Sequence, residues 1–189
     1  LYLAYFGRPL RYYDEVIYFN LKGDQTITES FSTFISNQSE FHNSYSDAAP
    51  IEHQINDLYN NLFCRDADND GLMYWLNSLN SNAKGIDSLA IHLIYNTYQL
   101  KILNHTQAIV DYNTLLQKIQ VCNYLIDIIR NNNQYNSFYN PISYEPWISG
   151  YFIDEIKSFI RTVDSKYQPS LQVIDNFIQK SCYKINNNF

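Results

Sequence analysis

The feature that most constrains this chain is the stretch 58–76, which joins two apolar helical faces through an acidic turn. Three apolar residues spaced at i, i+4 and i+5 share one face of the first predicted helix: Leu58, Leu62 and Phe63. Arg65 closes this helix, where a cation complements the negative end of the helix dipole. Asp68 is placed to cap the second helix by accepting from the backbone N–H of Asp70 or Gly71. The face that packs back on the first helix follows at three- and four-residue spacing: Leu72, Trp75, Leu76 and Leu79.

Composition narrows the class of protein. The 189 residues are 46% hydrophobic and 17% charged, which is typical of a folded chain. A net charge of −6 argues against a protein that binds nucleic acid by neutralising phosphates, so no nucleic-acid partner is expected. The sequence has no apolar run of about 18 residues, and therefore no membrane span is predicted. The first residues already have the pattern of a helix interior, so we expect a fragment of a longer protein, compatible with a cleaved signal peptide.

Aromatic residues and cysteines give weaker signals. The 18 Tyr residues and the abundant Asn suit a surface that meets sugars, because Tyr rings have apolar faces and amides both donate and accept hydrogen bonds. Codon bias and helix packing explain the same composition, and both interpretations stay open. Cys64, Cys122 and Cys182 are widely spaced and form no Cys-x-x-Cys pair, so zinc or thioredoxin-type chemistry is not indicated. At most one disulfide could form, and we expect instead that all three cysteines are small buried hydrophobic residues.

The rest of the chain also has helical patterning. No segment shows sustained period-two alternation, so the predicted fold class is all-α. Gly7 can adopt the left-handed C-cap conformation and, with Pro9, ends the first helix, and Thr26 with Glu29 has the spacing of a capping box. Residues 36–50 are polar and predict a linker. Helices are predicted at residues 1–8, 14–21, from 26, 51–63, 89–104, 111–130 and 147–163, and Ser170 is predicted to cap a last helix.

Two parts of the chain repeat each other. Leu1, Phe6 and Arg8 match Leu58, Phe63 and Arg65 at a constant offset of 57 residues. We therefore predict a multi-helix domain built on a tandem three-helix repeat, with units at about 1–50 and 51–105. Residues 106–189 are predicted to form additional C-terminal helices that extend the repeat or pack on it.

The two units carry the motifs of a known family. Residues 1–9 read Leu-Tyr-Leu-Ala-Tyr-Phe-Gly-Arg-Pro, and the second unit has Arg65, Asp68, Gly71-Leu72 and Tyr74-Trp75-Leu76. Over about residues 1–104 the chain resembles the bacterial family named domain of unknown function 4214. Its pattern is Phe-Gly-Arg, an Asp-Pro-x-Gly-Leu helix start, and Tyr-Trp-Leu. Cys64 stands where the family has Gly, and Asn69 stands where Pro is usual.

The resemblance implies a location and a role. Such domains occur in secreted, repeat-rich proteins and in surface-layer proteins of Gram-negative bacteria, and the chain is similar to the helical N-terminal regions that anchor such layers. It implies an extracellular or cell-surface location, with cell-surface polysaccharide or the lipopolysaccharide O-chain as partner. Self-assembly into a layer is implied in the same way.

One candidate metal site lies in the acidic turn. Asp66, Asp68 and Asp70, followed by Gly71, imitate the first half of a calcium loop. Position twelve of that loop is Asn77, where a bidentate Glu is expected. Helix capping explains Asp68 and Gly71 without a metal, so no cofactor is required and calcium is the alternative.

One candidate glycan site lies in the polar, aromatic stretch 131–147. Its rings stand among amides, as in sites that stack sugars: Tyr135, Phe138, Tyr139, Tyr144 and Trp147. The alternative is a connector whose aromatic residues cover helix ends.

No catalytic motif is found. The four histidines lack metal-binding spacing, and Asp154 and Glu155 diverge by roughly 100° on a helix. We expect a non-catalytic module of a secreted or surface-layer protein that binds cell-surface polysaccharide and supports anchoring or assembly. The alternatives are a structural or protein-interaction module without a ligand, and a helical accessory domain of a larger carbohydrate-active enzyme.

Overall fold

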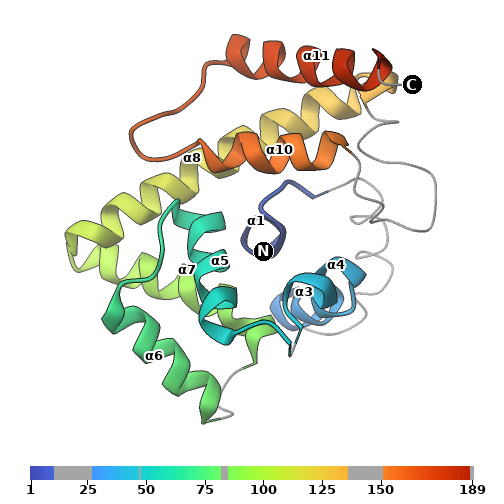
Figure 1. The fold of residues 1–189 in the computed structure, drawn as a ribbon. Coiled ribbons are helices and arrows are strands. Elements are labelled where there is room, and N and C mark those ends of the chain that lie inside the picture. The colour runs from blue at the N-terminus through green and yellow to red at the C-terminus, as the bar shows by residue number, and fades with distance from the viewer. Residues whose placement is uncertain (11–26, 47, 82–84, 136–150, 188–189) are drawn as a thin grey trace.

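The described part of the chain is entirely helical (Figure 1). The computed structural model describes residues 1–10, 27–46, 48–81, 85–135 and 151–187. These residues contain no strand, so the all-α prediction is confirmed. The helices are α1 (Tyr2–Phe6), α3 (Ile27–Ser36), α4 (Ser39–Ser44), α5 (Ile51–Phe63), α6 (Asn69–Asn80), α7 (Ile86–Ile102), α8 (Thr106–Arg130), α10 (Tyr151–Arg161) and α11 (Leu171–Asn187).

Helix α5 lies between α1 and α8 and organises the core. Leu58, Leu62 and Phe63 are all buried, as their spacing predicted. The predicted bounds of this helix, 51–63, are confirmed. Helix α1 is buried along its whole length, α3 packs on α7, and α10 packs on α11 and α8 (Figure 1). No helix of the described residues is both long enough and apolar enough to cross a membrane.

Helices α1 and α5 end in the same way. Gly7 and Cys64 are the C-caps, with left-handed φ angles of 63° and 58°. Gly7 therefore has the conformation that the sequence predicted, which costs glycine nothing because it lacks a Cβ. Cys64 adopts it with a side chain, and its Sγ lies 3.1 Å from the carbonyl oxygen of Val163 and 3.3 Å from that of Arg161. The cap of α5 is thereby joined to the end of α10.

The residues around these two caps also correspond. The guanidinium of Arg8 stacks over the ring of Tyr2 at 5.0 Å, and that of Arg65 over Tyr59 at 5.2 Å. This local correspondence follows the predicted offset of 57 residues. The tandem three-helix repeat as a whole is not confirmed, because residues 11–26 lie outside the described part of the chain.

Side chains cap the carbonyl ends of both helices. The amide of Asn61 on α5 donates to the carbonyl oxygen of Ala4 at 2.9 Å. Lys118 on α8 donates in turn to the carbonyl oxygens of Asn61 and Asn60, at 2.6 and 3.1 Å. Burial lowers the pKa of this lysine. Because the last carbonyls of a helix lack partners within it, each donor ties one helix to the next.

A buried ion network holds the N-terminal segment in place. Arg8 is completely buried and donates to Glu40 of α4 at 2.9 Å. Lys157 of α10 donates to the other oxygen of Glu40 at 2.6 Å. One carboxylate therefore joins the end of α1 to α4 and α10.

Three predicted segments differ from the structure. Residues 36–50 are not only a linker, because they contain the short helix α4, in which Phe41 is buried with the following Tyr45. Helix α8 begins at Thr106 rather than at residue 111, with the His105 imidazole as its N-cap. Helix α7 begins at Ile86, three residues before the predicted start. The predicted helix at 14–21 and the capping role of Thr26 lie outside the described residues.

The predicted boundary after residue 105 falls in the turn between α7 and α8. Helix α8 packs on both α7 and α5. The division into two regions stays a prediction. Cys122 and Cys182 are buried and all three cysteines are free thiols, as expected, while Cys64 is only half-buried.

Candidate functional site

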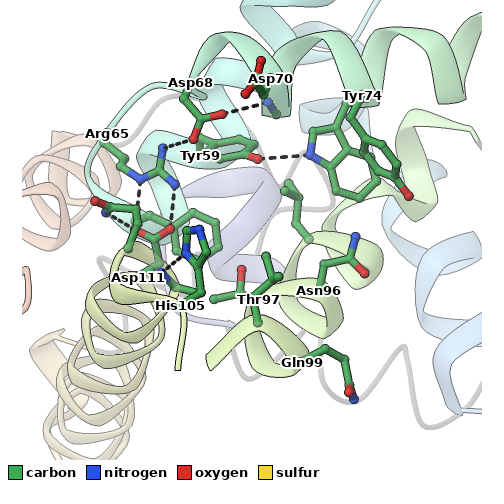
Figure 2. Close-up of a pocket in the computed structure, with 17 residues that line it drawn as sticks. Tyr59, Arg65, Asp68, Asp70, Tyr74, Asn96, Thr97, Gln99, His105 and Asp111 are labelled. Carbon is green, nitrogen blue, oxygen red and sulfur yellow. Dashed lines mark hydrogen bonds and ion pairs between the residues drawn. The ribbon is translucent and has the colours of Figure 1, made fainter. Parts of the chain in front are cut away.

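A cleft of about 570 Å³ lies between the α5–α6 turn, α6, α7 and the start of α8 (Figure 2). Figure 2 shows Arg65, Asp68 and Asp111 at one end, Tyr74 at the other, and Asn96 and Thr97 of α7 between them. Its volume is in the range of small-ligand sites, roughly 300–1,000 Å³.

An ion pair builds the first end of the cleft. Arg65 donates to both oxygens of Asp111, from Nε at 2.9 Å and from Nη2 at 2.6 Å. The same carboxylate accepts from Gln107 at 2.9 Å. These hydrogen bonds hold the pKa of the Arg65 guanidinium above its usual value, although burial opposes the shift. The pair fixes α8 against the α5–α6 turn, and a bidentate geometry of this kind is rigid.

The acidic turn is formed as the sequence predicted. Asp68 is the N-cap of α6, and its Oδ1 accepts from the backbone N–H of Gly71 at 2.8 Å. Its other oxygen lies 3.8 Å from Nη1 of Arg65. The turn is stabilised further by Asn56, whose Oδ1 accepts from the N–H of Ala67 at 3.0 Å.

Aromatic side chains form the second end of the cleft. Trp75 is buried, and its Nε1 donates to the hydroxyl of Tyr59 at 3.1 Å. Burial raises the pKa of Tyr59, and the hydrogen bond from Trp75 opposes that shift. The Tyr74 ring packs against Trp75 at 4.8 Å with an interplanar angle of 79°. Because Tyr74 is 55% exposed, most of its ring remains free to meet a ligand.

Polar groups on α7 and at the start of α8 complete the lining. Within the described part of the chain, the amides of Asn96 and Gln99 have no hydrogen-bond partner. The His105 Nδ1 accepts from the backbone N–H of Ala108 at 3.5 Å. Because Nδ1 is the acceptor of this cap, the Nε2 edge of the imidazole is the part of His105 that is left to meet a ligand in the cleft. The free groups at this site can both donate and accept.

The three predicted calcium ligands do not converge. Asp68 is engaged in the helix cap, and Asp66 accepts from the Asn60 amide at 2.6 Å. Asp70 is exposed in the first turn of α6. Among the residues that the structure describes, no group of three His, Cys, Asp or Glu side chains is arranged to hold a metal ion. This geometry supports capping as the function of the acidic turn.

The predicted glycan residues lie almost entirely outside the described residues. Tyr135 is half-buried and packs against the core, and its N–H donates to Asn132 Oδ1 at 3.2 Å. The other four are not described: Phe138, Tyr139, Tyr144 and Trp147. That site stays a prediction.

The cleft itself was not predicted, although parts of its lining were. Tyr74 belongs to the Tyr-Trp-Leu motif, which indicates the family but no binding site. Asn96, Gln99 and Asp111 lie on predicted helices without a pattern that distinguishes them. These residues come together because each lies on the side of its helix that faces the cleft. No local motif indicates which side that is.

The comparisons with known proteins bear on the middle of the chain. Residues 31–91 match the model of a family described as Domain of unknown function (DUF4214). This match confirms the predicted family over the residues that contain α4, α5, α6 and the acidic turn. No match was found among the curated proteins or the solved structures.

Proposed function

We propose that this chain, whose residues 31–91 belong to the DUF4214 family, is a glycan-binding module that uses the cleft between α6, α7 and α8. In this proposal it is a non-catalytic part of a secreted or surface-layer protein and helps to anchor that protein to cell-surface polysaccharide. The observation that carries the proposal is an exposed Tyr74 ring beside the free amides of Asn96 and Gln99.

These groups match the two surfaces of a sugar. The C–H groups on one face of a sugar ring pack on an aromatic side chain, and amides donate to and accept from its hydroxyls. The amides need no rearrangement, because neither is engaged with another described residue. The Arg65–Asp111 pair holds the opposite end of the cleft rigid, which lowers the entropic cost of binding.

The charge of the cleft favours uncharged sugars. Arg65 is neutralised by Asp111, while Asp68 and Asp70 add two further carboxylates to the lining. An acidic glycan would meet like charges, whereas a neutral hexose or N-acetylated sugar would not. We therefore expect neutral repeating units as ligands.

The test is a screen of bacterial surface polysaccharides on an array, followed by titration calorimetry with the best binder. Tyr74→Ala is expected to weaken binding by about tenfold or more, equivalent to about 1.4 kcal/mol. Asn96→Ala is expected to weaken it as well. The matched control is Tyr183→Ala on α11, which removes another exposed tyrosine, 71% exposed, far from the cleft lining.

Three results separate the alternatives. Absence of binding to every polysaccharide, or unchanged affinity in Tyr74→Ala, would contradict the cleft as the site. Affinity that falls in Tyr139→Ala or Trp147→Ala instead would locate the site in the stretch predicted from sequence. Loss of polysaccharide binding in the presence of a calcium chelator would indicate that the acidic turn binds calcium.

A further inference from the structure

The α7–α8 hairpin has a second, apolar surface. We define the outer hairpin face as Tyr95, Tyr98 and Ile102 of α7 with Tyr112, Leu116 and Ile119 of α8. Tyr95 is 59% exposed and Ile102 52% exposed, and Leu116 and Ile119 are each 41% exposed. Large exposed apolar side chains that gather in one place mark an interaction site, whereas scattered ones do not.

The six residues form one continuous surface. On each helix they recur at three- and four-residue spacing, which places them on a single stripe. The rings of Tyr98 and Tyr112 lie 5.9 Å apart and join the two stripes across the hairpin. Lys101 covers this junction, with its Nζ 4.6 Å from the Tyr112 ring and 5.8 Å from the Tyr98 ring.

The outer hairpin face is separate from the cleft. Leu93, Asn96 and Leu100 of α7 line the cleft. None of the six residues of the outer hairpin face lines the cleft. At 100° per residue, Tyr95 and Ile102 lie about 160° and 180° from Leu93, and about 100° and 120° from Asn96. Gln99, which also lines the cleft, lies beside Tyr95 on the helix. Helix α8 already has an apolar side in the core, formed by Leu115, Cys122 and Leu125. Its exposed Leu116 and Ile119 therefore form a second apolar side that the core of one chain does not use.

We infer that the outer hairpin face is the contact between two copies of this chain in a symmetric dimer. The exposed parts of its side chains, with the neighbouring exposed Leu103, amount to roughly 600 Å². This is close to the area of about 800 Å² per partner that a stable interface buries. The same patch on both copies gives the self-complementary contact that two-fold symmetry requires.

The charges of the chain leave the outer hairpin face open to a second copy. The chain carries a net charge of −6, so two copies associate best where carboxylates are absent. Lys101 is the charged side chain at the outer hairpin face, and Asp111 and Lys118 of the same stretch of α8 are buried on its inner side. A membrane surface would instead select several Lys and Arg residues.

The dimer would have a consequence for polysaccharide binding. Because none of the six residues of the outer hairpin face lines the cleft, we expect both clefts to stay open when the outer faces meet. Two sites on one particle then bind a repeating polymer with avidity, which exceeds the affinity of one site. The dimer itself does not depend on the cleft being a glycan site, so the two proposals fail separately.

The test is sedimentation velocity of the full chain without sugar, from micromolar to near-millimolar concentration. We expect a monomer–dimer equilibrium whose dissociation constant rises at least about tenfold in Leu116→Glu and in Ile119→Glu. The control is Leu171→Glu on α11, which introduces the same charge at a residue 59% exposed and should leave the equilibrium unchanged. Circular dichroism verifies that each variant is folded, and Tyr95→Ser provides a milder substitution if either glutamate variant unfolds.

A wild-type chain that stays monomeric throughout, or a control that dissociates as readily as the variants, would overturn the inference. So would a dimer that Tyr95→Ser and both glutamate variants leave intact. If the chain is monomeric and still binds polysaccharide, the dimer proposal fails and the glycan-binding proposal stands.

Discussion

The Arg65–Asp111 pair allows a quantitative test, because its two members differ in exposure. The Asp111 side chain is 6% exposed, whereas that of Arg65 is 26% exposed. Arg65→Met removes the charge and keeps the apolar stem, which leaves a buried carboxylate with Gln107 as its remaining donor. Removing one partner of a buried pair costs about 3–5 kcal/mol, and the burial of Asp111 places this variant in that range.

The reverse substitution should cost less. Asp111→Leu keeps the branched shape and leaves the guanidinium, which retains the Asp66 carbonyl at 2.9 Å, Asp68 at 3.8 Å and access to water. We expect a loss of about 1–2 kcal/mol, since a hydrogen bond to a charged group contributes about 1.5–3 kcal/mol and hydration compensates in part.

The assay is urea unfolding of the wild type, both single variants and the double variant, followed by Trp fluorescence and circular dichroism. The double variant should be more stable than the sum of the single losses predicts, by about 2–3 kcal/mol, because it leaves no buried charge without its partner. The reasoning is refuted if Asp111→Leu costs as much as Arg65→Met, or if the two losses add.

Two further predictions concern stability. Gly7→Ala should lower the free energy of unfolding by about 2–3 kcal/mol in urea titrations, because φ is +63° and a Cβ would lie 2.8 Å from Oδ1 of Asn61; an unchanged midpoint would contradict this packing. Burial raises the pKa of the Cys122 thiol from 9.0 to about 12, so the folded chain holds this proton where the unfolded chain loses it. Stability is therefore fully present below pH 9 and declines above it, by about 2 kcal/mol from this thiol near pH 10.5. Cys122→Ala should show a shallower decline in unfolding experiments under reducing conditions, and an equal decline would show that other groups cause it.

Local signals in the sequence predicted much of the helical structure. The bounds of α5, the Asp68 cap and the left-handed Gly7 each depend on residues close together in the chain, and each is confirmed. Ser170 also caps α11 as predicted, accepting from the N–H of Val173 at 3.3 Å. Short-range propensities and caps can be read from sequence because their partners are two to four residues away.

Two of the predictions differ from the structure for different physical reasons. The polar composition of residues 36–50 predicts a linker. The segment forms a helix because Phe41 and Tyr45 are buried in the core, and this packing is not visible in the local sequence. The apolar pattern predicts the start of α8 at residue 111, five residues late, because His105 is not among the residue types that usually cap a helix. In both cases tertiary packing or an uncommon cap outweighed the local pattern.

The sequence alone therefore determined an all-α chain, a resemblance that the family model matches over residues 31–91, and the capped turn from α5 to α6. The tertiary structure decided which helices meet, and with them the partners of Arg65 and Arg8, which come from α8 and α4. It also decided that Tyr74 faces Asn96 across a cleft, and that Tyr98 and Tyr112 join an exposed apolar face. Helical periodicity fixes which side of a helix is apolar, but the neighbour that covers that side depends on long-range packing, which no short window of sequence contains.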